Sequence, residues 1–172
     1  DIVLNVCSGN YYCKDGFSAQ GRALGKGVID IDNNDMYGGG KMADLLNPAT
    51  FQFCLDVIEG RRCAGIVGAQ PCAPGSLIRH RKLQGAPGEE PPYCPPPVVT
   101  SQYPDGVPGL TGALGRELHD SRLLGYRLSY LGKRTFSLGG WFFYESPSRL
   151  GDKTRPALFD PSFADHSNVM GM

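Results

Sequence analysis

One proline–cysteine turn has the residue types and the position to carry chemistry. Residues 63–67 form a short apolar run that is typical of a buried strand, and the run ends abruptly at Gly68. Pro71 then fixes one backbone angle, and Cys72 follows it directly in the loop beyond the strand. In an open α/β sheet, this end of a strand belongs to the edge at which ligands bind. We therefore expect Cys72 to lie at a ligand-binding edge.

A glycine loop and an acidic strand end form a second candidate set, suited to a nucleoside cofactor. A first strand is expected before the turn-rich loop that contains Gly9, and a short helix after it. A strand, a glycine loop and a helix in this order present backbone N–H groups to a cofactor. The second strand ends at Asp32, where dinucleotide and nucleoside folds hold a ribose hydroxyl. Asp32 is equally placed to cap the turn of residues 33–35, and the sequence leaves both roles open.

The elements that must position these residues alternate along the chain. The pattern predicts strands at residues 2–7, 27–32, 42–46, 63–67 and 140–144, the last of them buried and ending at Glu145. It predicts helices at residues 17–24, 48–59 and 110–131. Such alternation is typical of a parallel sheet with right-handed crossovers. We therefore expect an α/β fold with a mostly parallel, doubly wound sheet and helices on both faces.

The helix that begins after Asn47 has the clearest signals. Asn47 is placed as its N-cap and Pro48 as its first helical residue, and Gly60 is expected to close it at C′. Four residues at positions i, i+3, i+4 and i+7 define one buried face, namely Phe51, Cys54, Leu55 and Ile58. We expect this helix to pack on the sheet through that face.

Length and composition indicate one globular domain over residues 1–172. With 24 glycines and 14 prolines the chain is rich in irregular structure. Residues 82–108 are expected to form a long Pro/Gly-rich insertion, and residues 148–172 a C-terminal tail that wraps the domain. The 17 basic and 17 acidic residues balance, so no overall field recruits nucleic acid.

The cysteines and the N-terminus bear on whether the protein binds zinc, spans a membrane or carries a targeting segment. The six cysteines include no Cys-x-x-Cys pair, which argues against a structural zinc site. Cys7, Cys54 and Cys63 fit the role of small buried hydrophobes. No apolar stretch approaches the roughly 20 residues that a bilayer span requires. Because the chain opens on Asp1 with no targeting segment, we expect a soluble protein that was either trimmed or processed, as in an organelle.

An ordered series of short stretches is similar to the motifs of one enzyme family. The stretches are residues 3–9 with 14–17, 44–51, 68–72, 103–110 and 143–147. Together they resemble the catalytic half of the S-adenosylmethionine-dependent cytosine-C5 DNA methyltransferases, most closely a short divergent branch found in predicted proteins of certain algae. Residues 68–72 stand where the family has Gly-Gly-Pro-Pro-Cys, and residues 143–147 look like its Glu-Asn-Pro motif.

This resemblance implies a Rossmann-like methyltransferase fold with S-adenosylmethionine as the cofactor. In the family, the cysteine adds to C6 of cytosine while the glutamate binds the N3 edge of the flipped base. By that resemblance, Cys72 is the nucleophile and Glu145 its partner, at one sheet edge because their strands are neighbours in the family. The cofactor is expected beside the first strand, near Gly9, Asp32 and Asp44.

The chain departs from the family at the residues nearest to the cofactor and the base. Tyr11 replaces the second glycine of Gly-x-Gly, Gln70 replaces a proline, and Ser146 replaces asparagine. Neither a target-recognition domain nor a Gln-x-Arg-x-Arg motif follows. These changes favour a degenerate, non-catalytic methyltransferase-like protein that serves as an accessory or structural subunit among protein partners. The alternative is an active S-adenosylmethionine-dependent methyltransferase that uses Cys72 on a nucleic acid.

Overall fold

The computed structural model describes residues 2–9, 13–37, 39–69, 98, 102–103 and 106–145 of the chain. The chain divides into two compact units. The first consists of Asp1–Gln70 and Asp120–Glu145, and the second of Pro71–His119 and Ser146–Met172. The sheet lies entirely in the first unit.

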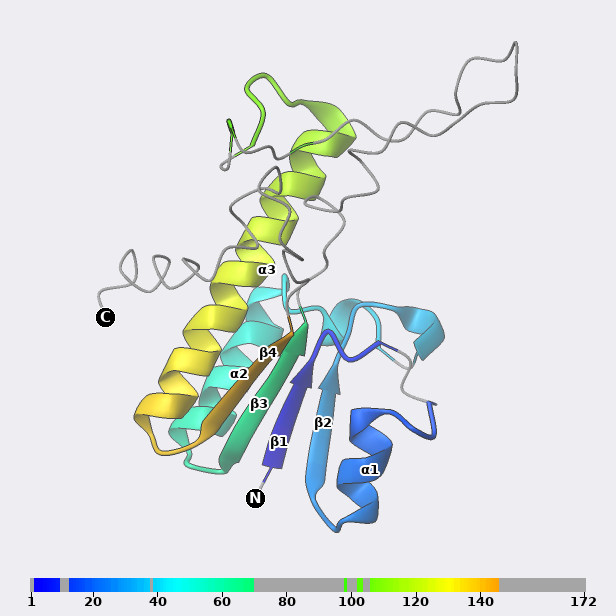
Figure 1. Ribbon diagram of the computed structural model, residues 1–172, viewed down its shortest axis with the longest axis vertical. Helices are drawn as coiled ribbons and strands as arrows, with labels where there is room; N and C mark the ends of the chain where they lie inside the picture. The colour runs from blue at the N-terminus through cyan, green and yellow to red at the C-terminus, as the bar shows by residue number, and fades with distance from the viewer. Residues whose placement is uncertain are drawn as a thin grey trace. The chain divides into compact units, whose positions relative to one another are not determined.

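Four parallel strands form the sheet of the first unit (Figure 1). They are β1 Ile2–Val6, β2 Gly27–Ile31, β3 Cys63–Ala69 and β4 Trp141–Glu145, in the spatial order β2-β1-β3-β4. Val6 pairs with Ile31 on one side and with Gly68 on the other, and Gly68 pairs with Tyr144. Because all four strands run the same way, their carboxyl ends meet at one edge. The predicted α/β class with a parallel sheet is confirmed.

Helices cover the two faces of the sheet unequally. The three helices are α1 Phe17–Ala23, α2 Pro48–Glu59 and α3 Gly112–Ser137, of which the part from Asp120 onward belongs to the first unit. Figure 1 shows α2 and α3 on one face, with α1 on the other side beside β2. Successive strand residues point to opposite faces, so Leu4 and Val6 face α2 and α3 while Val3 and Asn5 face α1.

The hydrophobic core lies between the sheet and the pair α2 and α3. Its fully buried side chains come from β1, β3 and both helices and include Leu4, Val6, Cys54, Ile58, Ile66, Leu128 and Leu131. Burial of these apolar side chains is the main favourable term in the stability of the unit. The buried face predicted for α2 is confirmed, with Cys54 and Ile58 inside and Phe51 and Leu55 packed at its margin.

The ends of α2 confirm one predicted cap and correct the other. The Asn47 side chain accepts a hydrogen bond from the Ala49 backbone N–H at 2.9 Å, and Pro48 follows it, as predicted. Gly60 is the C-cap with an ordinary φ of −69°, and Arg61 is the left-handed residue with φ 54°. A Cβ at Gly60 would lie 3.0 Å from the Asp56 carbonyl oxygen, so close approach rather than a left-handed conformation favours glycine there.

The strand predicted at residues 42–46 is wrong. Lys41–Ala43 is a short 3₁₀ helix, followed by a turn in which an Asp44 carboxylate oxygen accepts the Leu46 N–H at 2.8 Å. An aspartate that bonds the backbone two residues ahead competes with strand pairing. The turn leaves Leu45 buried in the core, which accounts for the apolar pattern of the segment.

Two further predictions on the carboxyl-terminal side of the first unit need correction. Helix α3 runs to Ser137 rather than ending near residue 131, and Thr135 continues its buried face. Among the described strands, β4 is the last of the sheet, and it is exposed rather than buried, with Trp141 43% and Phe143 60% exposed. Its position at the sheet edge leaves only the side facing α3 covered, so Phe142 packs against the core and Phe143 does not.

The second unit is described only in part. Val98 is buried, and its carbonyl oxygen accepts the Val107 N–H at 2.9 Å. Most of the predicted Pro/Gly-rich insertion at residues 82–108 and all of the tail at residues 148–172 lie outside the described residues. In the described part of the chain, no helix combines the length and the apolar character needed to cross a membrane.

Candidate functional site

The carboxyl edge of the sheet brings together most of the predicted site residues. Gly9 lies three residues beyond β1, Asp32 directly follows β2, and Glu145 is the last residue of β4. Glu145 pairs in register with Ala69, the last residue of β3. The strand that leads toward Cys72 is therefore the neighbour of the strand that ends at Glu145. Cys72 itself lies outside the described residues.

Asp32 holds two backbone segments at this edge. One carboxylate oxygen, Oδ2, accepts the Gly9 N–H at 2.9 Å, and the other, Oδ1, accepts the Asn34 N–H at 2.9 Å. The second bond is the turn cap that the sequence allowed. The first was not predicted and ties the loop after β1 to the end of β2. A single carboxylate thus fixes the relative positions of two loops at the sheet edge.

The loop around Gly9 has an open side and an unpaired hydroxyl. Gly9 has a φ of +67°, and a Cβ built on it would meet no atom within 4 Å. The neighbouring Ser8 Oγ is buried and has no hydrogen-bond partner among the described residues. A buried hydroxyl without a partner is uncommon and marks a place where water or a ligand group belongs. Sequence reasoning missed Ser8, although it lies between the first strand and the glycine.

Cys7 directly follows β1, and two carboxylates affect the pKa of its thiol. Burial, and to a smaller extent the negative charges of Asp32 and Asp44, together raise the pKa of its thiol to about 12. Asp32 and Asp44, two residues of the predicted cofactor set, are therefore both near enough to Cys7 to act on its pKa. The raised pKa favours the neutral thiol of Cys7 over the thiolate at neutral pH.

Tyr144 extends the cluster across the sheet. Burial raises the pKa of its phenol to about 12, with a smaller contribution from the charge that Cys7 carries when ionised. Tyr144 lies on β4, which β3 separates from the strand that leads to Cys7. Glu145, the next residue, is exposed. The carboxyl edge therefore carries the acids Asp32 and Glu145, with Asp44 and the partly buried thiol of Cys7 close to Asp32's end of it.

The cysteines differ in ways that labelling can measure. Cys13 is exposed, whereas Cys54 is buried and has its pKa raised to about 12 by burial, like Cys7. In native protein treated briefly with iodoacetamide, we expect Cys13 to be alkylated more than about a hundredfold faster than Cys7 or Cys54. Peptide mass spectrometry measures the alkylation rate of each cysteine. In urea, the three rates should become equal. Native labelling of Cys7 at the rate of Cys13 would contradict the partial burial and the raised pKa of Cys7.

A metal site is not formed by the residues that the structure describes. Within those ranges, no three side chains of His, Cys, Asp and Glu are grouped closely enough to hold an ion. The polar groups described at the edge include carboxylates, backbone N–H groups and one unpaired hydroxyl.

Comparison with known proteins does not assign a family to the chain. No protein-family model matches it, and searches of the curated proteins and of the solved structures likewise find no match. What this edge can do is therefore decided by its own residues and their geometry.

Proposed function

We propose that the chain is a Rossmann-like, methyltransferase-like protein that has lost catalysis and serves as an accessory or structural subunit among protein partners. One observation carries the proposal. Both oxygens of the Asp32 carboxylate are engaged by backbone N–H groups, one from Gly9 and one from Asn34. The acid that the resemblance assigns to a ribose is here a tether between loops.

The residues of the edge do not fit S-adenosylmethionine in the way the resemblance requires. A ribose needs a carboxylate whose oxygens face the two hydroxyls. Asp32 faces backbone instead, and Asp44 Oδ1 accepts the Leu46 N–H. The Gly9 N–H, which a cofactor loop would turn outward, is turned onto Asp32. Loop residues that satisfy one another leave fewer free groups for a ligand.

The strand order supports a methyltransferase-like ancestry. The parallel order β2-β1-β3-β4 makes the strand before Cys72 and the strand ending at Glu145 neighbours, as in the family that the sequence resembles. Helices on both sides of the sheet are what a doubly wound fold requires. The resemblance and the strand order are independent, since one concerns short motifs and the other concerns pairing.

Strand β4 supports a role among protein partners. It is an edge strand rich in aromatic residues, and Trp141 and Phe143 are exposed on it. An exposed edge strand is a ready template for another chain, and tryptophan is among the residues that most often anchor protein interfaces. Such an edge gives a structural subunit a surface on which to bind another chain.

An active methyltransferase is the second candidate, favoured by different observations. The open side of Gly9 and the unpaired Ser8 hydroxyl leave polar groups that a ligand would satisfy. Glu145 stands at the end of the strand beside the one that leads to Cys72. In this reading Cys72 adds to the base as a thiolate and Glu145 binds its edge, as the resemblance implies.

A calorimetric titration of the purified chain with S-adenosylmethionine separates the two candidates. The non-catalytic subunit should give no binding heat even at millimolar cofactor, because Asp32 is committed to Gly9 and Asn34. Micromolar binding that survives Cys72→Ala and is lost in Asp44→Ala would overturn the proposal in favour of the enzyme. Cys72→Ala is the matched control because it alters the base side of the edge and leaves the cofactor side intact.

A further inference from the structure

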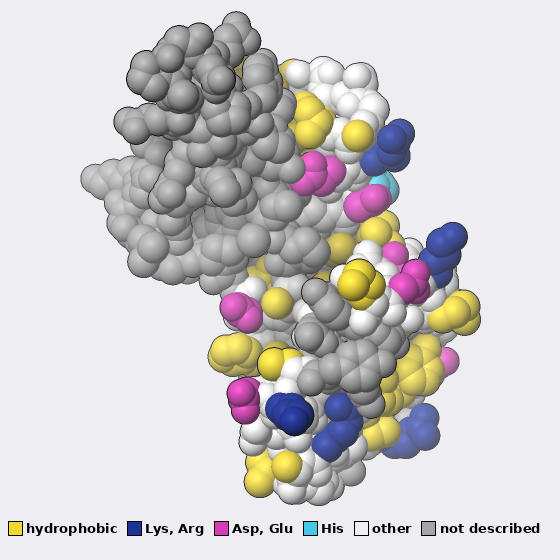
Figure 2. All heavy atoms as spheres, turned by 90° about the vertical axis from the view of Figure 1, so that its right-hand side faces the viewer, with side chains coloured by type: hydrophobic (Ala, Val, Ile, Leu, Met, Phe, Trp, Pro, Cys, Tyr) yellow, Lys and Arg dark blue, Asp and Glu magenta, His cyan; other side chains and the backbone are white. Residues whose placement is uncertain are grey.

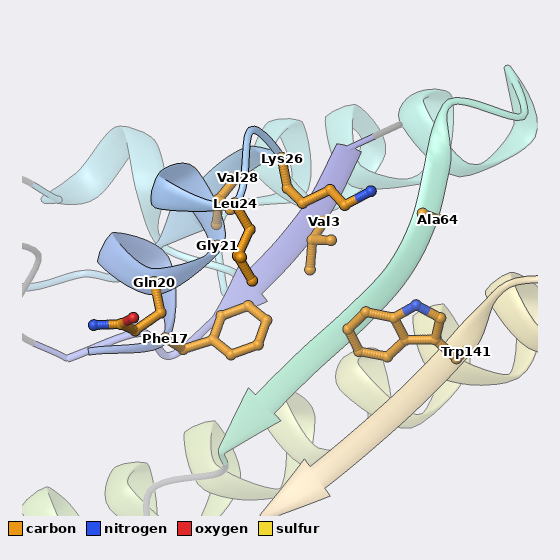
Figure 3. Close-up of a pocket in the computed structure, with 9 residues that line it drawn as sticks. All are labelled: Val3, Phe17, Gln20, Gly21, Leu24, Lys26, Val28, Ala64 and Trp141. Atoms are coloured by element: carbon orange, nitrogen blue, oxygen red, sulfur yellow. The ribbon is translucent and has the colours of Figure 1, made fainter. Parts of the chain in front are cut away.

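A hollow of about 290 Å³ lies toward the amino ends of the strands, away from the carboxyl edge (Figure 3). Its walls come from β1, α1, β2, β3 and β4, and its lining residues include Val3, Phe17, Leu24, Val28, Ala64 and Trp141. All of them belong to the first unit. The proposed function uses Trp141 as an exposed residue of β4 and assigns no role to the hollow itself, so that role is a separate question.

The hollow exists because α1 covers only part of its sheet face. The helix has seven residues and packs over β1 and β2, where Gly21 comes so close to Val28 that an added Cβ would lie 2.8 Å from its Cγ2 atom. Over β3 the covering group is the Trp141 indole, which lies 2.2 Å from the position of a Cβ at Gly65. Figure 3 shows the Phe17 and Trp141 rings on opposite sides of the space between them.

Lys26 gives this apolar hollow a positive charge. Its side chain runs toward the hollow in Figure 3, with the amine at the rim above Val3. The lining contains no carboxylate, and Lys26 forms no ion pair with any residue in the described ranges. Gln20 is the other polar group of the lining. On the α1 side of the molecule, Figure 2 shows hydrophobic side chains beside Lys and Arg side chains.

We propose that the hollow binds a small aromatic carboxylate or a related aromatic anion. Its volume is at the lower limit of small-molecule sites, roughly 300–1,000 Å³, so it suits one or two rings rather than a helix. Phe17 and Trp141 offer faces for ring stacking. Lys26 at the rim complements an anionic group that remains partly hydrated, which fixes the orientation of the ligand.

The probe for this proposal is 1-anilinonaphthalene-8-sulfonate, an aromatic anion, with N-phenyl-1-naphthylamine as its uncharged counterpart. Trp141 is the single tryptophan of the chain and lines the hollow, so a dye bound there must quench its emission, and the variants below locate the dye. We expect one anionic dye per chain, with strong quenching of the Trp141 emission. In Lys26→Gln, the affinity for the anionic dye should fall by about tenfold while that for the neutral dye changes less than about twofold.

Two further variants and one pair of competitors complete the test. Lys41→Gln removes the same charge from an exposed lysine outside the hollow and should leave both affinities unchanged. Ala64→Leu places a larger side chain in the floor of the hollow and should weaken the binding of both dyes. 3-Phenylpropionate should displace the anionic dye and the equally sized 3-phenylpropanol should not. Dye binding without quenching of Trp141, or equal effects of Lys26→Gln and Lys41→Gln, would overturn the proposal even if Ala64→Leu failed to fold.

Discussion

Replacing Asp30 with alanine is expected to lower the free energy of unfolding by about 3 kcal/mol. Asp30 Oδ1 accepts a hydrogen bond from the Asn5 amide at 2.9 Å and another from the Ser18 hydroxyl, and Asp30 Oδ2 binds the Arg22 guanidinium. Asn5 and Ser18 are buried between β1 and α1. Without the carboxylate, their buried donors lose an acceptor that water cannot replace. Urea unfolding followed by circular dichroism measures the change.

Two variants show which part of the network carries the effect. Arg22→Ala should cost no more than about 1 kcal/mol, because the Arg22 side chain is 36% exposed and solvent weakens its ion pair with Asp30. Asp30→Asn keeps an acceptor for Asn5 and Ser18. Its loss in the free energy of unfolding should therefore lie between those of Asp30→Ala and Arg22→Ala. An Arg22→Ala loss as large as that of Asp30→Ala would show that the ion pair, rather than the buried acceptor, stabilises the position of α1.

Replacing Gly68 with alanine should destabilise the protein by about 2 kcal/mol, although alanine is ordinarily the better residue in a strand. A Cβ at Gly68 would lie 2.5 Å from Leu128 Cδ1 and 2.7 Å from its Cδ2. Leu128 is fully buried in the core under β3, so its side chain has little room to move away. Thermal or urea unfolding gives the stability of the variant.

A double variant distinguishes this contact from a general effect of substitution in β3. Leu128→Ala alone should cost about 3 kcal/mol, since it leaves a cavity in the core. In the Leu128→Ala background, the methyl group of Gly68→Ala occupies part of that cavity instead of colliding with the leucine. The two changes should therefore be less than additive by about 1 kcal/mol or more. Strict additivity would mean that Gly68 and Leu128 do not meet as described.

Local patterns in the sequence were sufficient for most elements of the first unit. The apolar runs of β1 and β3 and the Asn47 cap of α2 are encoded in a few consecutive residues, because strand periodicity and helix capping act over short distances. The exposure of β4 could not be predicted in this way. Its five residues read as buried, and only its place at the end of the sheet leaves Trp141 and Phe143 exposed.

The candidate site, too, was predictable in part from local sequence and depended in part on the tertiary structure. The sequence by itself determined which acids and glycines follow the strands, since Asp32 directly follows one apolar run and Gly9 comes shortly after another. Only the tertiary structure decided that the Asp32 carboxylate accepts hydrogen bonds from the Gly9 and Asn34 N–H groups. It also decided that Lys26 and Trp141 border one hollow. The physical reason is that hydrogen bonds and apolar contacts between strands depend on sheet order and register, which residues far apart in the chain set together.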